Sequence, residues 1–356
     1  MSSDQKENSF LQFEKRKADH IHLSLDSSNQ ASEHSDFSKV ELVHEALPDL
    51  NFNEVDISST SLNEDLKVPF FVSSMTAGHV AGVDLNLRLA KACQARGWLM
   101  GVGSQRRELS DGTAQEEWEQ VRKIAPQVKL LGNIGISQLI SLKNSQVESL
   151  VDSLQATAMI VHLNALQEGL QPEGTPHFRG GFDRILELAE TLSVPVILKE
   201  TGCGFSKLTL ERLLQTKVKA IDVSGLGGTH WGRIEGGRSE DNELLRAASE
   251  TFKSWGISTV ESVQNAVSLN PTFEVWASGG VRSGLDAAKM LAMGCESVGF
   301  AQPILEAALV SEERLFQVMR QFEFELKLAL FCTGSANLNE LKAKKVWKWK
   351  TANPMT

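Results

Sequence analysis

The hydrophobic residues of this chain change their rhythm at about Val68. Beyond that point, short apolar runs alternate with longer segments in which apolar residues recur every three or four positions. The short runs are mostly apolar or β-branched throughout, as expected of parallel strands that are covered on both faces. We predict strands at residues 69–74, 98–102, 129–133, 158–164, 194–200, 220–224, 273–278 and 297–301.

Amphipathic segments separate these strands, and a long helical region at about residues 303–332 follows the last one. Repeated strand–helix units of this kind build a parallel sheet. Eight consecutive units favour an α/β fold of the TIM (β/α)8 barrel type, with an open doubly wound sheet as the alternative. The intervening helices are predicted at residues 83–96, 113–124, 137–155, 182–192, 207–216, 260–269 and 284–293.

The chain divides into an N-terminal arm at residues 1–67, the barrel at residues 68–335 and a C-terminal tail at residues 336–356. Within the arm, residues 24–36 are rich in Ser, Asp, Asn and Glu and indicate an exposed loop. Within the tail, the stretch 346–350 alternates tryptophan and lysine and indicates a surface or interface segment.

The glycine-rich stretch at residues 225–237, after the sixth strand, is long for a barrel loop. We predict that it is a mobile lid that closes over the bound ligand and excludes water. A disordered linker is the alternative. The sequence leaves open whether the N-terminal arm reaches the site of its own subunit or that of a neighbour.

Composition excludes several classes of protein. Of the 356 residues, 41% are hydrophobic and 23% are charged, which is typical of a globular protein and excludes a disordered chain or a coiled-coil rod. No stretch approaches the roughly 18 apolar residues of a membrane span, and the first eight residues lack the apolar core of a secretory signal. The net charge of −9 argues against a nucleic-acid partner or a membrane surface, so an anionic ligand needs a local cluster of bases.

Four cysteines are widely spaced and form no CxxC pair: Cys93, Cys203, Cys295 and Cys332. This spacing argues against a zinc site and against a disulfide framework, and it suits a reducing compartment. We therefore expect a cytoplasmic protein. The sequence contains no tyrosine, which excludes a mechanism that uses a tyrosine acid or nucleophile.

Polar or glycine-rich segments follow all eight predicted strands. Because the active site of such a barrel lies at the carboxyl ends of its strands, these segments are candidate binding residues. Glycine turns alone would explain two or three of the eight ends, but not all of them. The segments are residues 73–78, 101–107, 132–135, 162–168, 199–202, 224–230, 278–284 and 301–302.

The seventh and eighth strand ends indicate a phosphate site. Ser278-Gly279-Gly280 lets the backbone approach a ligand closely, and Gly284 opens a helix whose free N–H groups attract an anion. TIM barrels often bind phosphate after strands seven and eight. The sequence therefore predicts a cofactor that bears phosphate.

Lys199 ends a buried strand and needs a negatively charged partner. The partner could be Glu200 or another core carboxylate, which would make the lysine structural. Lys199 could instead form a Schiff base, as in some barrel aldolases. It could also lie beside an electron-rich ring and stabilise negative charge there, which suits a reduced flavin.

A further cluster follows the fourth strand and contains His162, Asn164, Gln167 and Glu168. Taken singly, the histidine would be an ordinary core residue and the glutamate a solvated one. Together they favour a site in which Glu168 holds Mg²⁺ beside phosphate oxygens.

Two basic groups remain, one in the N-terminal arm and one after the second strand. A run of like charges is usually a solvated face. In an acidic protein, bases beside a strand-end site are also candidates for a second, anionic ligand, because arginine and lysine grip diphosphate. The residues are Arg16, Lys17 and His20 in the arm, and Arg106 and Arg107 after the strand.

In combination, these motifs resemble one family, the type 2, flavin-dependent isopentenyl diphosphate isomerases. The resemblance covers about residues 13–330. An N-terminal Arg-Lys-x-x-His and a His-x-Asn-x-x-Gln-Glu run distinguish this family from other flavin barrels. The matching motifs lie at residues 16–20, 74–76, 101–106, 133, 162–168, 199–200, 224–231, 279–282 and 301–302.

The resemblance implies a TIM barrel that carries FMN and interconverts isopentenyl and dimethylallyl diphosphate. It implies that FMN acts in its reduced form, usually with NADPH as reductant, that Mg²⁺ is needed, and that the chains form a homotetramer or homo-octamer. The implied FMN contacts are Ser73, Ser74, Met75, Thr76, Ser104, Asn133, Lys199, Ser224, Thr229, Gly280, Val281, Arg282, Ala301 and Gln302. The implied substrate contacts are Arg16, Lys17, His20, Ser104, Arg106, Asn133, His162 and Gln167.

Within this resemblance, Glu168 would hold the metal, and Gln167, Lys199 and His162 would be the catalytic residues. One departure is Ala77, which stands where the family usually has glycine and leaves the affinity for FMN open.

Moving a double bond requires a proton to be added at one carbon and removed from another, through a species with tertiary carbocation character. No strong side-chain acid stands out at a strand end, whereas the ring nitrogens of a reduced flavin can donate and accept a proton. The hypothesis is that the flavin is the acid–base group. Gln167 would then position or shuttle a proton, and Lys199 would hold negative charge at the pyrimidine end of the flavin.

Two other functions compete with this one. An FMN-dependent 2-hydroxy acid oxidase or dehydrogenase would share the barrel, but it would need a base, commonly a histidine after strand seven. Ser278-Gly279-Gly280 occupies that place, and His230 after strand six is a poorer candidate. A flavin-binding sensor without turnover is the third possibility, and the dense polar set at every strand end argues against it.

Overall fold

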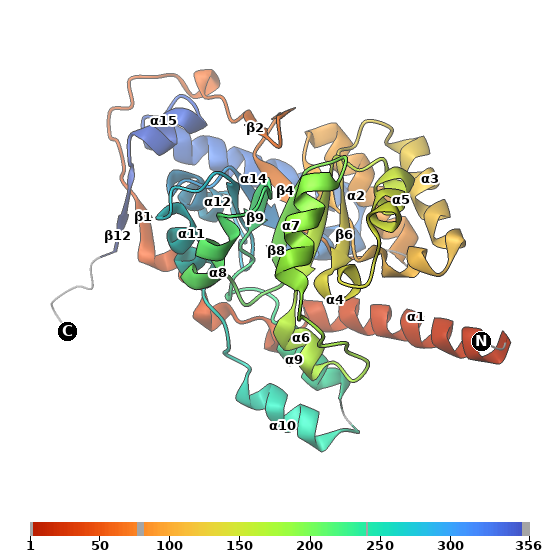
Figure 1. Ribbon diagram of the computed structural model, residues 1–356. Helices are drawn as coiled ribbons and strands as arrows, with labels where there is room; N and C mark the ends of the chain where they lie inside the picture. The colour runs from red at the N-terminus through yellow and green to blue at the C-terminus, as the bar shows by residue number, and fades with distance from the viewer. Residues whose placement is uncertain (1–2, 77–81, 240, 351–356) are drawn as a thin grey trace.

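The computed structural model describes residues 3–76, 82–239 and 241–350, and eight of the strands in this part of the chain close into a parallel barrel (Figure 1). The predicted TIM barrel is therefore confirmed, and the open sheet is excluded. Around the barrel the order is β10-β11-β4-β5-β6-β7-β8-β9. The strands are β4 (Phe70–Val72), β5 (Leu99–Gly101), β6 (Leu130–Gly135), β7 (Ala158–Leu163), β8 (Val196–Glu200), β9 (Ala220–Asp222), β10 (Glu274–Ala277) and β11 (Ser297–Phe300).

Two apolar clusters form the core. One fills the interior of the barrel and includes Phe71, Ile197 and Trp276. Leu62 and Leu66 of the hairpin formed by β2 (Ser59–Ser61) and β3 (Glu64–Leu66) join this interior cluster. The backbone N–H of Leu62 donates to Glu274, the first residue of β10, so the hairpin lies at the amino-terminal end of the strands. The larger cluster packs the strands against the surrounding helices. Because the hairpin covers the amino-terminal end of the barrel, the carboxyl ends of the strands remain open for a site.

The helices of the barrel follow the predicted order, with two corrections. The single helix predicted at residues 137–155 is two helices, and the region 303–332 is also broken in two. The second break is at Ser311, where extended backbone starts a new helix and the hydroxyl accepts from the N–H of Arg314. The helices are α2 (Val83–Arg96), α3 (Glu116–Ile124), α4 (Ile136–Leu139), α5 (Asn144–Leu154), α7 (Gly181–Thr191), α8 (Lys207–Leu213), α11 (Thr259–Val267), α12 (Gly284–Ala292), α13 (Gln302–Val310) and α14 (Glu312–Cys332).

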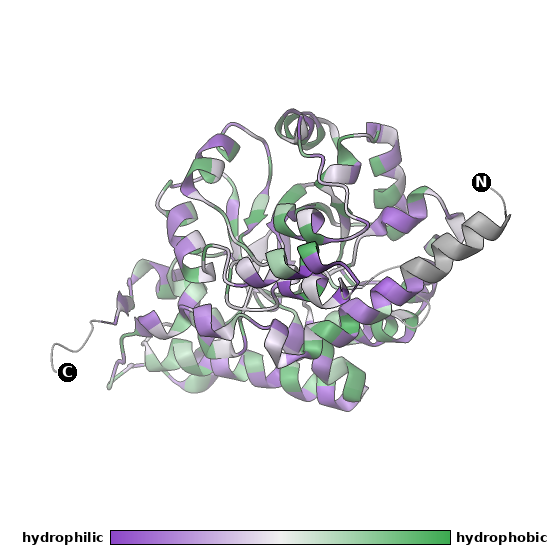
Figure 2. Ribbon diagram, turned by 90° about the horizontal axis from the view of Figure 1, so that it is seen from below, coloured by the Kyte–Doolittle hydropathy of each residue, from purple (hydrophilic) through white to green (hydrophobic). Residues whose placement is uncertain are grey.

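The N-terminal arm contains a long helix that the hydrophobic pattern does not predict, α1 (Ser3–Leu25). In Figure 2 this helix runs from the N-terminus toward the centre of the molecule. The exposed loop predicted at residues 24–36 is wrong in part, because Asn29, Gln30 and Ala31 are buried. Short 3₁₀ turns build this segment, and Gln30 bonds to Thr229 after the sixth strand. The segment therefore joins the arm to the barrel.

The C-terminal tail belongs to the fold. β12 (Trp347–Trp349) pairs antiparallel with β1 (Val40–Leu42), and α15 (Leu338–Ala343) precedes it. This two-stranded ribbon connects residues near opposite ends of the sequence. The stretch with alternating tryptophan and lysine is thus a strand that lies at the surface, as predicted, with Lys348 and Trp349 exposed.

The glycine-rich stretch after the sixth strand contains a helix, α9 (Trp231–Arg238), and α10 (Glu243–Thr251) follows it. The alternative of a disordered linker is therefore wrong. Figure 1 places α9, α1 and α6 (Ala165–Leu170) together at one end of the barrel, with β2 at the other end. Among the described residues, no helix combines the length and the apolar character needed to cross a bilayer.

Candidate functional site

One pocket opens at the carboxyl ends of the barrel strands, and α1 contributes to its wall. All of the residues that the resemblance assigns to the site line this pocket, although their individual roles remain predictions. The other candidate base, Arg107, does not line it and pairs with Asp111 at 2.8 Å. Ala77 lies outside the described residues. From the predicted set, the lining residues are Arg16, Lys17, His20, Ser73, Ser74, Met75, Thr76, Ser104, Arg106, Asn133, His162, Gln167, Glu168, Lys199, Ser224, Thr229, Gly280, Val281, Arg282, Ala301 and Gln302.

At the carboxyl end of β8, Lys199 points into the pocket and is paired with Asp222 of β9. Its Nζ lies 2.5 Å from Oδ2 of Asp222 and donates to the hydroxyl of Ser278 at 3.0 Å. Of the partners considered, the structure therefore has another core carboxylate and not Glu200. Glu200 instead accepts from the backbone N–H groups of residues 201–204 and fixes the turn after β8.

The first strand end offers hydroxyl groups to a ligand. Ser73, Ser74 and Thr76 each carry a buried side-chain oxygen that has no hydrogen-bond partner among the described residues. A buried hydroxyl without a partner costs free energy, so a group that bonds these oxygens would bind favourably. Ser224 on the opposite wall adopts φ +37°, a conformation that residues other than glycine rarely take. Such strain is concentrated at binding sites.

The seventh strand end has the glycine turn that was predicted for a phosphate site. Gly279 and Gly280 adopt φ values of +95° and +78°, and a side chain at Gly280 would collide with the backbone of Gly227. Glycine is therefore required here both for the turn and for close backbone contact.

The α12 helix begins at Gly284, but the prediction that its first N–H groups are free for an anion is wrong. The N–H of Gly284 donates to Glu325 at 2.6 Å and that of Asp286 to Ser283 at 3.0 Å, and Gly284 does not line the pocket.

Arg282 is engaged with the chain itself. Its guanidinium donates to the carbonyl oxygens of Gly227 and Gly280, at 3.0 and 2.9 Å, and to Gln30 and Ser32 of the arm. It thus ties the turns after strands β9 and β10 to the N-terminal arm. The sequence motif indicates a cofactor contact, whereas the structure indicates at least an additional role in building the wall.

His162 is held in one orientation by Asn133. The amide nitrogen of Asn133 donates to the carbonyl of Val102, so its oxygen is left to accept from Nδ1 of His162 at 2.8 Å. Nε2 of the histidine is then the unprotonated, accepting nitrogen. Burial, together with the charges of Lys17 and Lys199, lowers the pKa of His162 to about 4, so the ring is neutral at pH 7.

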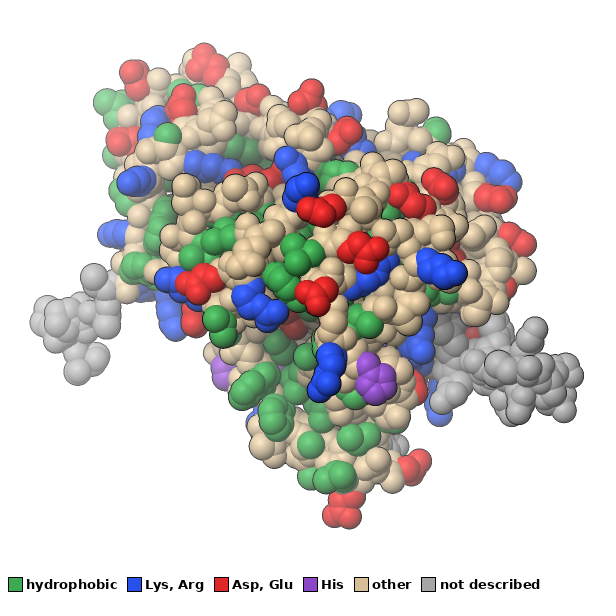
Figure 3. Space-filling model, in the orientation of Figure 1, with side chains coloured by type: hydrophobic (Ala, Val, Ile, Leu, Met, Phe, Trp, Pro, Cys, Tyr) green, Lys and Arg blue, Asp and Glu red, His purple; other side chains and the backbone are tan. Residues whose placement is uncertain are grey.

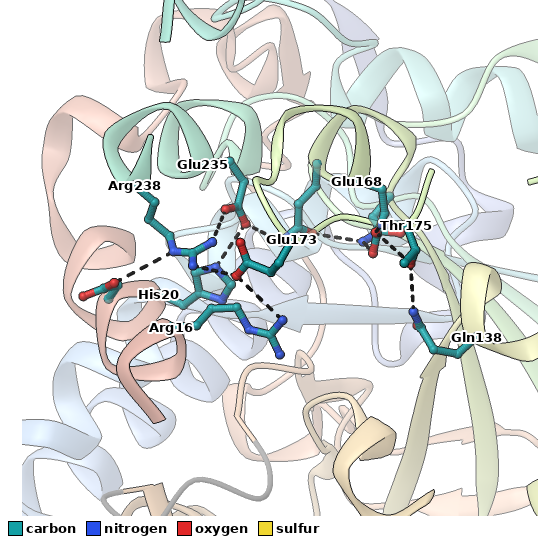
Figure 4. Close-up of polar contacts among 11 residues, drawn as sticks. Arg16, His20, Gln138, Glu168, Glu173, Thr175, Glu235 and Arg238 are labelled. Atoms are coloured by element: carbon teal, nitrogen blue, oxygen red, sulfur yellow. Dashed lines mark hydrogen bonds and ion pairs between the residues drawn. The ribbon is translucent and has the colours of Figure 1, made fainter. Parts of the chain in front are cut away.

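Figure 4 shows the chain of contacts that begins at Glu168. Glu168 accepts from the backbone N–H of Thr175 at 2.6 Å and from Asn164 at 3.2 Å. Asn164 also donates to the oxygen of Gln167, whose amide nitrogen donates to Glu235 at 2.9 Å. Gln167 is thus fixed from both sides.

Glu235 on α9 connects this chain to the arm. It is fully buried, and one of its oxygens lies 3.0 Å from Nε2 of His20 on α1. Arg238 donates to the other oxygen at 2.5 Å and to Glu173 at 2.7 Å. Burial disfavours the charged form of Glu235, but the contacts with His20, Arg238 and Gln167 hold its pKa below the usual value.

The basic residues of α1 reach the pocket of the same chain. The guanidinium of Arg16 lies 3.8 Å from Glu173, and the rings of His20 and Trp231 meet edge to face at 5.0 Å. Burial and the neighbouring charge of Arg16 lower the pKa of Lys17 to about 8. The arm thus adds positive charge opposite the strand ends.

Sequence reasoning assigned no individual site role to Glu235, Arg238, Glu173 or Asp222. Trp231, Glu235 and Arg238 are spaced four and three residues apart, which would have placed them on one face of a helix if the glycine-rich stretch had been interpreted as helical. Glu173 lies in a connection whose position no periodicity specifies. Asp222 interrupts an apolar strand, and that interruption was the available signal.

Glu168 is a single candidate metal ligand. Among the described residues, no three or more His, Cys, Asp or Glu side chains gather as a metal-binding group.

His230, the candidate base after the sixth strand, is fully buried. It accepts from the N–H of Arg233 and contacts the carbonyl of Trp255. It therefore serves α9 as an N-cap.

Comparisons with known proteins agree with this geometry. Residues 14–125 and 171–348 match the model of the family described as FMN-dependent dehydrogenase. An isopentenyl-diphosphate delta-isomerase of Legionella pneumophila (strain Lens) is 52% identical over 338 residues, which is 95% of this chain and 99% of that protein. Its counterpart in Bdellovibrio bacteriovorus is 52% identical and covers 94% of this chain and 98% of its own.

Solved structures of lower identity have the same fold. A mutant flavocytochrome b2 with benzoylformate superimposes with a TM-score of 0.69 at 17% identity, over 96% of this chain and 86% of its own. A mandelate oxidase mutant with an FMN adduct gives 0.65 at 14% identity, over 92% and 93%. With the identity to its relatives extending over nearly the whole chain, the protein belongs to the FMN-dependent dehydrogenase family and, within it, to the isopentenyl-diphosphate delta-isomerases.

Proposed function

We propose that this protein interconverts isopentenyl and dimethylallyl diphosphate, with reduced FMN bound in the pocket, NADPH as the reductant and Mg²⁺ as the metal. The observation that carries the proposal is a pocket with two separate places for phosphate. One is the backbone turn of Gly279 and Gly280, and the other is the basic face of α1. A cofactor phosphate and a substrate diphosphate can therefore be held at the same time.

The residues present fit FMN. The unpartnered hydroxyls of Ser73, Ser74 and Thr76 would bond the polar edge of the ring, and Lys199 would face its electron-rich part. The backbone at Gly280, with Gln302 at the start of α13, would hold the phosphate. When bound, reduced FMN would supply ring nitrogens that give and take a proton.

The diphosphate would bind between α1 and the strand ends. Arg16, Lys17, His20 and Arg106 supply the positive charge, and Arg16 can make paired hydrogen bonds with phosphate oxygens. Glu168 would hold Mg²⁺ against the same oxygens. Because one carboxylate is a weak site by itself, the metal and the diphosphate would bind together.

Gln167 would position the transferred proton. Its amide oxygen accepts from Asn164 and its nitrogen donates to Glu235, which leaves one N–H of the amide for the substrate or for a bridging water. His162 presents an accepting nitrogen to the pocket and would receive a hydrogen bond there. Binding energy from the remote diphosphate would hold the small alkene against these groups.

We also propose a cytoplasmic homotetramer or homo-octamer. Free thiols at all four cysteines support a reducing compartment. Exposed apolar side chains such as Leu244 and Trp255 near α10, a region where hydrophobic side chains gather in Figure 3, support burial against another copy. Sedimentation of the purified holoenzyme would establish the number of copies.

The alternative, an FMN-dependent 2-hydroxy acid oxidase or dehydrogenase, rests on structures that are similar at only 14–17% identity. Such an enzyme commonly uses a histidine base after the seventh strand, where this chain has Ser278, Gly279 and Gly280 instead. His230 is buried beneath α9 and bonded on both ring nitrogens, so it is unsuited to this task.

A substrate comparison on the FMN-loaded protein tests the proposal. We expect dimethylallyl diphosphate from isopentenyl diphosphate when NADPH is present, and no stoichiometric flavin reduction by mandelate or lactate in the absence of NADPH. Rapid bleaching of the flavin by a 2-hydroxy acid, with no isomerised product, would favour the oxidase.

A further inference from the structure

Asp222 lies beneath the pocket and takes no direct part in lining it. The register pairs Lys199 of β8 with Asp222 of β9, and Ser278 follows β10, the next strand in the barrel. All three side chains turn inward and meet. Lys199 and Ser278 line the pocket, whereas Asp222 is 1% exposed.

The hydrogen bonds among these groups have only one consistent direction. A carboxylate only accepts, so the hydroxyl of Ser278 donates to Asp222, at 2.7 Å. The same hydroxyl must then accept from Lys199, at 3.0 Å. Lys199 gives one N–H to Asp222 and a second to Ser278, and its third N–H is left for whatever occupies the pocket.

The charges lead to a second consequence. A lysine ammonium beside a flavin stabilises the negative charge that reduction adds. Asp222, bonded directly to that ammonium, cancels much of its field because the two opposite charges are in contact. The pocket therefore presents a directed N–H group with little net positive charge.

We propose that Asp222 is a positioning residue of the FMN site, which aims the third N–H of Lys199 at the flavin and keeps the reduced ring rich in electrons. This inference rests on the proposed function, since it requires FMN to lie against Lys199. An electron-rich ring gives up a proton readily and stabilises a neighbouring carbocation. Removal of the Asp222 charge would weaken both effects while leaving the diphosphate site on α1 intact.

The test compares Asp222→Asn with Glu323→Gln in the FMN-loaded protein. Glu323 is also a buried, ion-paired carboxylate, but it contacts Arg96 and Trp98 on the outside of the barrel. The measurements are the midpoint potential of bound FMN against a reference dye, and kcat and KM for isopentenyl diphosphate. We expect Asp222→Asn to favour reduced over oxidised FMN by at least tenfold, which is about 30 mV for a two-electron couple.

In the same variant we expect kcat to fall by at least tenfold and KM to change by less than threefold, whereas Glu323→Gln keeps the wild-type potential. An Asp222→Asn protein that binds FMN at the wild-type potential overturns the inference. If that variant does not fold, Asp222→Ser takes its place. It also removes the negative charge beside Lys199, so we expect a rise in the midpoint potential of bound FMN, and an unchanged potential also overturns the inference.

These outcomes are separable from failure of the proposed function. If the wild-type protein binds FMN but makes no dimethylallyl diphosphate, and Asp222→Asn still raises the midpoint potential, the isomerase is refuted and the role of Asp222 is supported. If the wild-type protein isomerises its substrate but Asp222→Asn leaves the midpoint potential unchanged, the isomerase is supported and the role of Asp222 is refuted.

Discussion

At the scale of single residues, the pocket contains groups whose pKa values are shifted by burial. Lys17 and His162 both have lowered pKa values, so one base of the site loses its charge just above neutral pH and the other is neutral throughout the ordinary range. Glu235 stays ionised because three partners surround it. These residues therefore have distinct tasks that the sequence alone does not separate.

The lowered pKa of Lys17 predicts a pH dependence. Below about pH 8 the ammonium is charged and would attract the proposed diphosphate substrate, and above it the charge is lost. The value of kcat/KM, which reports the free enzyme, should fall as the pH rises through 8. Lys17→Arg should abolish this fall, because arginine keeps its charge; a variant with the wild-type profile would assign the titration to another group.

Loss of the folded state would not explain the predicted fall in kcat/KM. The folded pKa of Lys17 lies below its ordinary value of 10.5, so between about pH 8 and 10.5 the unfolded chain binds more protons. In that window this lysine makes the free energy of unfolding rise with pH. Denaturant titrations at pH 7.5 and 9.5 separate the two effects, because activity and the contribution of Lys17 to stability change in opposite directions.

Gln167 should affect turnover more than binding. Gln167→Ala removes the amide that Asn164 and Glu235 hold in place, and a lost proton-transfer group lowers turnover by about 100-fold. The absorbance of bound FMN should stay that of wild type. Turnover within twofold of wild type would remove Gln167 from the mechanism.

Glu168 should determine the metal requirement. Glu168→Gln should raise the Mg²⁺ concentration for half-maximal activity by roughly tenfold or more, because the neutral amide is a much weaker ligand for a hard cation. Glu173→Gln is the matched control, since Glu173 contacts Arg16 and Arg238 in the same region. Equal Mg²⁺ requirements in both variants would place the metal elsewhere.

At the scale of elements, the contact between α1 and α9 completes the site. Neither helix was predicted, because α1 is polar over most of its length and α9 contains three glycines in eight residues. Charged groups join the two helices: His20 of α1 lies 3.0 Å from Glu235 of α9, and Arg238 of α9 lies 3.9 Å from Asp19 of α1. Such pairing between segments distant in sequence has no signature in local periodicity.

Arg238→Met should therefore loosen the arm. The change leaves Glu235 buried with less compensation, which costs on the order of 3 kcal/mol of stability. We expect KM for isopentenyl diphosphate to rise by about tenfold and trypsin to cleave faster at the bases of α1. Arg246→Met, on the exposed surface of α10, is the control. Equal rates of cleavage in both variants would show that Arg238 does not hold the arm.

At the scale of the whole molecule, the barrel and the position of its site could be predicted, because buried parallel strands leave a continuous apolar pattern and their carboxyl ends converge. That is why Ser73, Asn133 and Lys199, far apart in sequence, line one pocket. The β2–β3 hairpin and the β1–β12 ribbon could not be predicted, since each strand has only three residues, and β1 and β12 also lie near opposite ends of the sequence. Asp222 was missed because its partner is set by the register of the barrel.

The most direct test of the isomerase counts product molecules per flavin. The FMN-loaded protein is reduced once with dithionite without oxygen, freed of excess reductant, and given isopentenyl diphosphate and Mg²⁺ without NADPH. We predict many molecules of dimethylallyl diphosphate per flavin, with the flavin still reduced at the end, and no product from the oxidised protein. One product or fewer per flavin, or equal activity of the oxidised protein, would contradict acid–base catalysis by reduced FMN in this pocket.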